Sequence, residues 1–207
     1  MRPVITERDI PAAGALRIAA GSIVTPSARD LAARRGVTLH EVDPHEAPAL
    51  APPDRTIALG SDHGGFAMKQ ALLPVFADCG LTVRDTGVYE EAPADYPDIA
   101  LAVALLVQQG AATRGVIIDG AGIGSCMAAN KVPGVRAALC YDVASARNSR
   151  EHNDANVLTL GGRLLTATQA ESVLRTWLGT AFGGGRHAAR VGKIAAIEGR
   201  FLRAQKE

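Results

Sequence analysis

Short apolar runs alternate with helical periodicity along most of the chain, from about residue 55 onward. Runs of continuous apolar character, such as those at 56–61 and 114–120, are typical of strands that are buried on both faces. Between these runs, apolar residues recur at the spacing of an amphipathic helix. The pattern predicts strands at 56–61, 81–87, 114–120, 135–142 and 155–162, and helices at about 65–78, 97–109, 123–130, 143–151, 168–180 and from 186 onward.

Buried strands that are separated by helices indicate a parallel sheet, because right-handed crossovers place the helices on its two faces. We therefore expect an α/β fold with a doubly wound, Rossmann-like, five-stranded parallel sheet and helices on both faces. In such sheets the ligand crevice lies beyond the carboxyl ends of the strands. Candidate chemistry is expected in the residues that follow each strand.

A small strand-helix-strand extension is expected in residues 1–42. The stretch 16–21 predicts one strand and 37–42 another, while Thr25 and Pro26 predict the N-cap and first position of a helix between them. About 40 residues bury too little surface for a stable core of their own. We therefore expect this extension to dock on the main domain or on a partner.

Residues 43–54 contain four prolines, two of them adjacent, which favours an extended and semi-rigid linker. This places the main domain at 55–207. The total length of 207 residues leaves room for one such domain and a small appendage, but not for two full domains.

Composition and charge exclude several classes of partner. The chain is 47% hydrophobic and 21% charged, which is typical of a globular protein, and 22 Lys and Arg against 21 Asp and Glu give a net charge of +1. No long-range field therefore favours nucleic acid or an anionic membrane. Aromatic residues are only 4% of the chain, too few for a surface that stacks single-stranded bases.

The cysteine pattern and the absence of apolar segments point to the cytosol. The three cysteines form no C-x-x-C pair, and a chain of this size needs no disulfide scaffold. No window is long and apolar enough for a membrane span, and the first residues lack the apolar core of a signal peptide. We expect a cytoplasmic protein without a structural metal.

The first predicted strand is followed by Asp62, His63, Gly64 and Gly65. Two glycines allow the backbone to approach a ligand, and the helix that follows offers N–H groups to an anion. Asp62 and His63 either face that ligand, or serve as a helix cap and a surface residue respectively. The motif alone leaves both interpretations open.

The third predicted strand ends at Asp119 and is followed by the loop 120–124, G-A-G-I-G. Alternate glycines expose a run of backbone N–H groups, which suits an anionic oxygen or a developing oxyanion. A dinucleotide site fits poorly, since the spacing is G-x-G-x-G and the loop does not follow the first strand. A P-loop is excluded, because no Gly-Lys-Ser/Thr follows.

Two polar clusters lie further along the chain. The segment 150–154, R-E-H-N-D, precedes the fifth strand, and three glycines at 183–185 precede Arg186 and Arg190. These arginines are spaced i and i+4 in the first turns of a helix, where guanidinium groups and the helix dipole favour phosphate. The alternative is a solvated charged face.

Taken in order, the segments SDHGGF, DYPD, GAGIG, AANKVPGVRAALC, REHNDANVL and GGRHAARV resemble the type B ribose-5-phosphate isomerase and galactose-6-phosphate isomerase family. The resemblance covers about residues 55–200. It implies interconversion of aldose and ketose phosphates through an enediolate, without a metal or other cofactor. It also implies a homodimer or a dimer-based tetramer, with an active site that draws residues from two subunits.

The resemblance also implies roles for single residues. His152 matches the histidine implicated in sugar-ring opening, Asp62 assists it, and Asn153 contacts the substrate. His187 lies within the second arginine motif, with a less defined role. The other matches lie on the phosphate side (His63, Arg163, Arg186 and Arg190), in the loop that stabilises the enediolate (Gly120, Gly122 and Gly124) and in the pocket wall (Tyr96). Aldose–ketose chemistry accounts for these types, since it needs a base, an oxyanion pocket and a phosphate anchor.

The sequence departs from the family at the base. One branch of the family has Cys at the position of Asp119 and Thr at that of Ala121, and another has Glu at the position of Ser125. Asp119 is our candidate for the base, because it lies at a strand end beside the glycine loop; Cys126, near a helix N-terminus, is the second candidate. The third alternative is a protein that binds sugar phosphate without isomerising it.

The N-terminal extension carries a resemblance of its own. The segments ITERDI and GSIVTPSARDLAARRGVTL are similar to leader segments of bacterial microcompartment enzymes, over about 35 residues. This implies docking to a shell or core protein and a location inside a microcompartment. The alternative is a subdomain that packs on the catalytic dimer.

Overall fold

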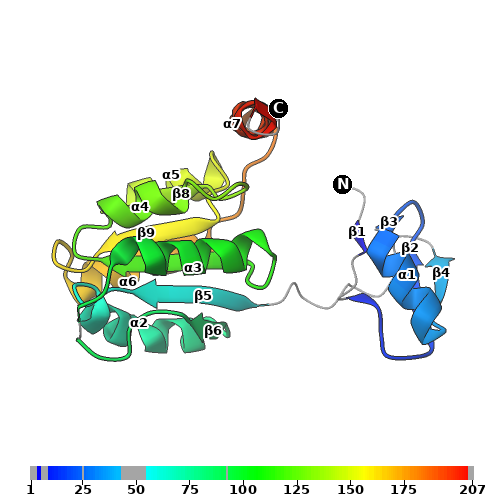
Figure 1. The fold of residues 1–207 in the computed structure, drawn as a ribbon, viewed down its shortest axis with the longest axis horizontal. Coiled ribbons are helices and arrows are strands. Elements are labelled where there is room, and N and C mark those ends of the chain that lie inside the picture. The colour runs from blue at the N-terminus through cyan, green and yellow to red at the C-terminus, as the bar shows by residue number, and fades with distance from the viewer. Residues whose placement is uncertain (1–3, 6–8, 25, 43–54, 92, 205–207) are drawn as a thin grey trace. The chain divides into compact units, whose positions relative to one another are not determined.

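The structure, a computed structural model, describes residues 4–5, 9–24, 26–42, 55–91 and 93–204. The chain divides into two compact units, residues 1–54 and 55–207 (Figure 1). The expected linker at 43–54 lies outside the described residues.

The N-terminal unit contains the expected strand-helix-strand arrangement. Strand β2 (Ala15–Ala19) pairs in parallel with β4 (Thr38–Val42), and helix α1 (Pro26–Arg35) connects them in sequence. A second parallel pair, β1 (Val4–Ile5) with β3 (Ile23–Val24), was not predicted, since strands of two residues produce no periodic pattern. The unit has its own small core, made of Ile5, Ile10, Ile18, Ala28, Ala32 and Val37.

The main unit is built on a five-stranded parallel sheet with the order β6-β5-β7-β9-β8. This confirms the doubly wound architecture. The inner strands β5, β7 and β9 are the most deeply buried, as their apolar sequences predict. The strands are β5 (Thr56–Ser61), β6 (Thr82–Asp85), β7 (Arg114–Asp119), β8 (Ala137–Leu139) and β9 (Val157–Gly161).

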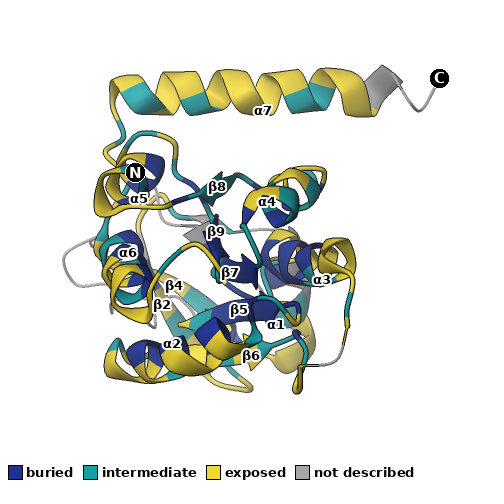
Figure 2. Cartoon of the chain, turned by 90° about the vertical axis from the view of Figure 1, so that its left-hand side faces the viewer, coloured by how far each residue is buried: buried dark blue, intermediate teal, exposed yellow. Residues whose placement is uncertain are grey.

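Helices cover both faces of this sheet (Figure 2). One face packs against α2 (Phe66–Asp78), α5 (Val143–Glu151) and α6 (Ala167–Gly179), in a core that includes the fully buried Trp177. The other face packs against α3 (Tyr96–Gln108) and α4 (Ile123–Ala129). The helix positions agree closely with those predicted from periodicity.

The strand order places the ligand crevice. The neighbours of β5 are β6 on one side and β7 on the other, and the chain winds in opposite directions from β5 to reach them. In open α/β sheets ligands bind at such a switch point, which here lies at the carboxyl ends of β5 and β7. We call the side of the sheet where the strands end the carboxyl edge, and the side where they begin the amino edge. Each helix returns the chain from the carboxyl edge to the amino edge, so α5 and α6 end at the amino edge.

The last helix, α7 (Arg186–Ala204), runs along the outside of the main unit (Figure 2). Its Glu198 carboxylate accepts the backbone N–H of Gly134, at 3.0 Å from each oxygen. Ile194, Ile197 and Phe201 on this helix remain exposed. Over the described part of the chain, no helix has the length and hydropathy that a membrane crossing requires.

Candidate active site

Asp62 lies at the carboxyl edge, directly after β5, and its side chain is buried. Its Oδ1 accepts the backbone N–H of Gly65, the N-cap residue of α2, at 2.9 Å, so Asp62 holds the turn before the helix and is not itself the cap. Within the described residues Oδ2 accepts no hydrogen bond. Gly65 has no room for a side chain, because a Cβ there would overlap the carbonyl of Ile118.

Asp119 ends β7, and its side chain is held by four donors. Its Oδ1 accepts the N–H groups of Ala121, at 2.8 Å, and of Gly122, while Oδ2 accepts the N–H of Ser125, at 3.0 Å, and the Ser125 hydroxyl. Four donors fill the acceptor sites of a carboxylate. The Gly122 N–H, which the sequence analysis assigned to the enediolate, is therefore directed at Asp119.

The rest of the glycine loop is open to a ligand. Among the described residues, the N–H groups of Gly120 and Gly124 donate to no protein acceptor. The loop is fixed from outside, since Tyr141 donates its hydroxyl to the carbonyl of Ala121 at 2.9 Å. Arg163, which follows β9, donates its N–H to the carbonyl of Gly120 at 3.0 Å, and its side chain passes close to that glycine.

Tyr96 begins α3 and packs directly on the loop. A Cβ at Gly124 would lie 2.5 Å from the Tyr96 ring, so only glycine permits this approach. The segment that leads to Tyr96 is anchored by the buried Lys69, whose Nζ donates to Asp85 at 2.7 Å and to the carbonyl of Val88 at 2.6 Å.

His63 is exposed, and its Nδ1 accepts the N–H of Ala94 at 3.4 Å. Together with the residues just described it forms a first group at the carboxyl edge, which we name the carboxyl-edge cluster. This cluster consists of Asp62, His63, Tyr96, Asp119, the loop 120–124 and Arg163.

His152 and His187 form the centre of a second group, at the amino edge. Their rings are stacked, with centroids 4.1 Å apart and planes 7° from parallel. Asn148 Nδ2 lies 2.9 Å from His152 Nδ1, and Asn153 Nδ2 lies 3.4 Å from Asn148 Oδ1. We name this group the amino-edge cluster; it consists of Asn148, His152, Asn153, His187 and the first turns of α7, with Arg186 and Arg190.

Although chemistry is expected in the residues that follow each strand, the candidate residues lie on two opposite edges of the sheet, where the strands end and where they begin. His152 and Asn153 follow helix α5 rather than a strand, and Arg186 follows α6. The five residues of β9 span about 16 Å between the edges. One small sugar cannot contact both clusters within a single chain.

The turn that carries His152 and Asn153 is rigid. Asp154 has a positive φ of 47°, and its two oxygens bind Arg136 and Arg150, each at 2.9 Å. The Arg150 side chain is buried and lies 5.6 Å above the Trp177 ring. The ion pairs therefore fix the backbone that presents the two site residues.

The surroundings of His187 lower the pKa of its imidazole. Partial burial lowers the pKa of His187, and the nearby His152, Arg186 and Arg190 lower it further, while Glu151 opposes them. His187 is therefore uncharged at neutral pH.

The Cys126 thiol is bonded away from the glycine loop. Cys126, the second candidate for the base, donates its thiol to the carbonyl of Ala137 at 3.4 Å, at the start of β8. Burial raises the pKa of Cys140 and favours its neutral thiol. Within the described residues, no three His, Cys, Asp or Glu side chains group in a way that could hold a metal ion.

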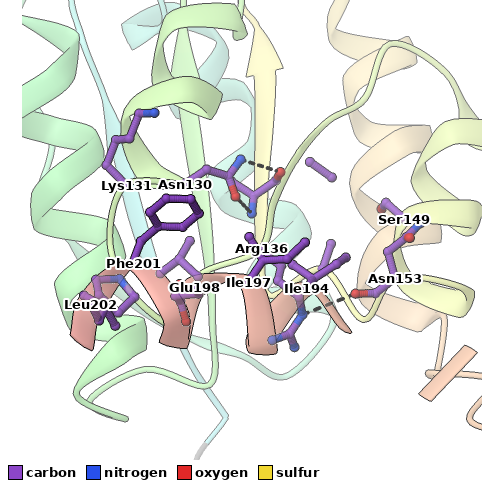
Figure 3. A pocket seen from close by; sticks show the side chains of 15 residues that line it. Asn130, Lys131, Arg136, Ser149, Asn153, Ile194, Ile197, Glu198, Phe201 and Leu202 are labelled. Carbon is purple, nitrogen blue, oxygen red and sulfur yellow. Dashed lines mark hydrogen bonds between the residues drawn. The ribbon is translucent and has the colours of Figure 1, made fainter. Parts of the chain in front are cut away.

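A cavity of about 870 Å³ lies between α7 and the segment 130–138 (Figure 3). Ile194, Ile197 and Phe201 line one side, and the segment 130–138 lines the other. Asn153 borders it, so the cavity adjoins the amino-edge cluster.

Sequence reasoning missed the supporting residues of both clusters. Ser125, Tyr141 and Asn148 act through hydrogen bonds that the fold creates. Of the three, only Ser125 could have been found from the sequence, because it directly follows the glycine loop.

Comparisons with known proteins identify the family of this chain. A sequence profile of the family described as Ribose/Galactose Isomerase matches residues 57–194. Ribose-5-phosphate isomerase B of Escherichia coli (strain K12) is 42% identical over 146 residues, covering 70% of this chain and 98% of that protein. D-erythrulose-4-phosphate isomerase of Pectobacterium atrosepticum is 37% identical over 147 residues, covering 69% and 95%. The solved structure of ribose-5-phosphate isomerase B from Clostridium thermocellum has a TM-score of 0.69 and 47% identity, covering 70% of this chain and 99% of that one. The chain therefore belongs to the Ribose/Galactose Isomerase family.

Proposed function

We propose that the protein interconverts the aldose and ketose forms of a small sugar phosphate, with no cofactor. The observation that carries this is the placement of a buried carboxylate, Asp119, beside a glycine loop with free N–H groups at the switch point of the sheet. Moving a carbonyl between C1 and C2 needs a base to transfer a proton between carbons and donors to stabilise the enediolate. Gly120 and Gly124 offer such donors.

Asp119 is the proposed proton shuttle between C1 and C2. One of its four hydrogen bonds must break before the carboxylate can take a proton. The Ser125 hydroxyl is the one donor of the four that can rotate away, since the other three are backbone N–H groups. Proton transfer to Oδ2 would then leave Asp119 donating to Ser125 Oγ.

The remaining roles follow the two clusters. His152 opens the sugar ring with assistance from Asp62, whose Oδ2 is available, and Asn153 contacts the substrate. The phosphate is held by the basic groups His63, Arg163, Arg186 and Arg190, and Tyr96 forms part of the pocket wall.

A homodimer would unite the two clusters in one site. Each chain presents one cluster at each edge of its sheet, so the carboxyl-edge cluster of one subunit and the amino-edge cluster of its partner supply all the roles above. The exposed apolar residues of α7 and the cavity beneath it offer a surface for a second copy. A tetramer would pair two such dimers.

Solvent exchange is the direct test of the chemistry. The protein is mixed in heavy water with aldose and ketose phosphates of four, five and six carbons, including ribose 5-phosphate and erythrulose 4-phosphate, and is followed by proton NMR. We expect deuterium at C1 or C2 of one compound together with its interconversion. No exchange with any compound would refute the isomerase proposal.

Variants separate the base from the phosphate anchor. Asp119→Asn should abolish exchange and leave sugar-phosphate binding nearly intact, and exchange that persists would exclude Asp119 as the base. Arg186→Ala with Arg190→Ala should weaken phosphorylated ligands selectively. An equal loss for the dephosphorylated sugar would contradict the phosphate assignment.

Mixing two inactive variants tests the shared site. Asp119→Asn disables the carboxyl-edge cluster and His152→Ala the amino-edge cluster, so an exchanged heterodimer contains one intact site. An equal mixture should regain roughly a quarter of the wild-type activity. Activity that does not return, despite subunit exchange shown by mass spectrometry, would place each site within one chain.

The second candidate function is a sugar-phosphate-binding or scaffold protein that does not isomerise its ligand. The four-fold hydrogen bonding of Asp119 is the observation that favours it, because all the acceptor sites of the carboxylate are already occupied by protein donors. A thermal shift with sugar phosphates but no exchange in heavy water would support this alternative.

We also propose that residues 1–42 dock the enzyme to a shell or core protein inside a bacterial microcompartment, within the cytoplasm. The support is the motif similarity and the position of the family match, which begins only at residue 57. Co-expression with shell proteins should retain the full chain and lose one that lacks residues 1–54. Equal retention of both would contradict the docking role.

A further inference from the structure

The amide of Asn148 faces the imidazole of His152 across one turn of α5. Asn148 Nδ2 lies 2.9 Å from His152 Nδ1, and the backbone N–H of His152 donates to the Asn148 carbonyl at 2.9 Å. The first contact holds the ring, and the second holds its backbone at the end of the helix. The Asn148 side chain therefore bears on which nitrogen of the His152 ring carries the proton.

The orientation of the Asn148 amide follows from its second partner. Asn153 directs its Nδ2 at Asn148 Oδ1, at 3.4 Å, which makes the oxygen of Asn148 the acceptor on that side. The Nδ2 group of Asn148 is thereby left to donate to His152. An amide nitrogen only donates, so Nδ1 of His152 must accept.

His187 lies against the same ring. The two rings are stacked with centroids 4.1 Å apart and planes 7° from parallel, which limits how far the His152 ring can turn. The charged groups around the pair are Arg186 and Arg190 on α7 and Glu151 on α5. Within this cluster the Nδ1 position of His152 has a donor facing it.

We propose that Asn148 is a positioning residue that fixes His152 in the neutral tautomer with its proton on Nε2, so that Nε2–H is presented to a sugar oxygen. Only the identity of that oxygen rests on the proposed function: in ring opening it is the ring oxygen of the sugar. The tautomer itself is a property of the free enzyme. Asn148 thus acts through His152 and touches no reacting atom.

Nitrogen-15 NMR of the full-length protein at pH 8 tests the tautomer directly, with the His152 signals assigned by their loss in His152→Gln. We expect Nδ1 to show the shift of an unprotonated ring nitrogen and Nε2 that of a protonated one. Asn148→Asp replaces the donor with an acceptor and should reverse the two assignments. A wild-type ring protonated at Nδ1, or unchanged assignments in Asn148→Asp, would overturn the proposal.

Two further variants control for structural effects. Asn148→Leu removes the donor with similar bulk and should give averaged shifts from both tautomers, while Arg147→Gln, at the neighbouring exposed position of α5, should leave the wild-type shifts. If Asn148→Leu does not fold, Asn148→Asp still decides the question. Averaged shifts in Arg147→Gln as well would show that the helix end, rather than Asn148, sets the tautomer.

Turnover of a ring-forming substrate, compared with turnover of one that cannot form a ring, tests whether the His152 tautomer matters for ring opening. Ribose 5-phosphate closes into a ring, whereas erythrose 4-phosphate cannot form a five-membered ring, because its O4 is phosphorylated. Asn148→Asp should lower turnover of ribose 5-phosphate about tenfold or more and change that of erythrose 4-phosphate less than about twofold. Equal losses would overturn the link to ring opening. No turnover of either by the wild type would refute the proposed function, while the NMR result would still decide the tautomer.

Discussion

The Ser125 hydroxyl donates a hydrogen bond to Asp119 Oδ2, and both side chains are buried beneath the glycine loop. The carboxylate thereby connects the end of β7 to the first turn of α4. This pair of residues keeps a carboxylate beside the glycine loop. We expect substitutions of Ser125 and of Asp119 to differ in their effects on the free energy of unfolding and on solvent exchange at the sugar carbons.

Ser125→Ala should leave solvent exchange intact and cost about 1 kcal/mol of unfolding free energy. The variant removes one hydrogen bond and keeps the three backbone N–H donors on Asp119. Asp119→Asn should cost more, about 1–3 kcal/mol, because its amide group would face N–H donors. Denaturant unfolding and heavy-water exchange measure both effects. Loss of exchange in Ser125→Ala would show that the hydroxyl itself takes part in proton transfer.

Gly124→Ala should weaken substrate binding by displacing the Tyr96 ring. A Cβ at this position would lie 2.5 Å from that ring, whereas a Cβ at Gly192, within α7, would meet no atom within 4 Å. Gly192→Ala is therefore the matched control, and it should stabilise the helix by up to about 1 kcal/mol. Steady-state kinetics should show a raised KM for Gly124→Ala only. An unchanged KM would show that the ring has room to move.

Asp154→Ala should destabilise the main unit by about 2–3 kcal/mol. The substitution leaves the buried guanidinium of Arg150 without its carboxylate partner. Glu171→Ala breaks an ion pair with Arg175 that is exposed on both sides, and it should cost less than about 0.5 kcal/mol. Urea unfolding of the two variants compares them, and similar costs would indicate that Arg150 finds another partner.

Stability should decrease as the pH falls below about 6.5, and His187 should account for part of this decrease. Its pKa is lowered from 6.5 in the folded state, so the unfolded chain binds more protons between that value and the lowered one. Stability is therefore present above pH 6.5 and is lost through this window, and then levels off below the folded-state pKa. Thermal unfolding at several pH values should show a shallower slope for His187→Gln. An unchanged slope would assign the pH dependence to other groups.

The sequence was sufficient to predict the main fold because each strand and helix has a strong period of its own. The order of the strands depends on which apolar faces meet, and periodicity does not contain that information. The position of His152 was easier to predict. The sequence places it at the end of a helix and before the fifth strand, and the parallel topology puts that position at the amino edge.

Partners of the site residues were harder to predict than the residues themselves. Asp119 was predicted as a carboxylate beside an open loop, and the structure shows that the loop folds back on it. Such short contacts depend on the φ and ψ angles of a few residues, as at Gly122 with φ of 79°. Asn148 gave no signal because an exposed asparagine in a helix is usually solvated.

Phe201→Asp should weaken self-association and activity together while the fold persists. Phe201 is 67% exposed on the apolar face of α7, beside the cavity that we assign to a second copy. Burying an aromatic side chain at the centre of an interface typically contributes at least about 2 kcal/mol, equivalent to a dissociation constant about 30-fold higher when it is lost. Ala196→Asp introduces the same charge on the opposite side of the helix and should change neither property. Sedimentation and turnover, measured at the same protein concentrations, should fall in parallel for Phe201→Asp, because the proposed site joins two clusters from two subunits. A monomer with full activity would contradict the shared site.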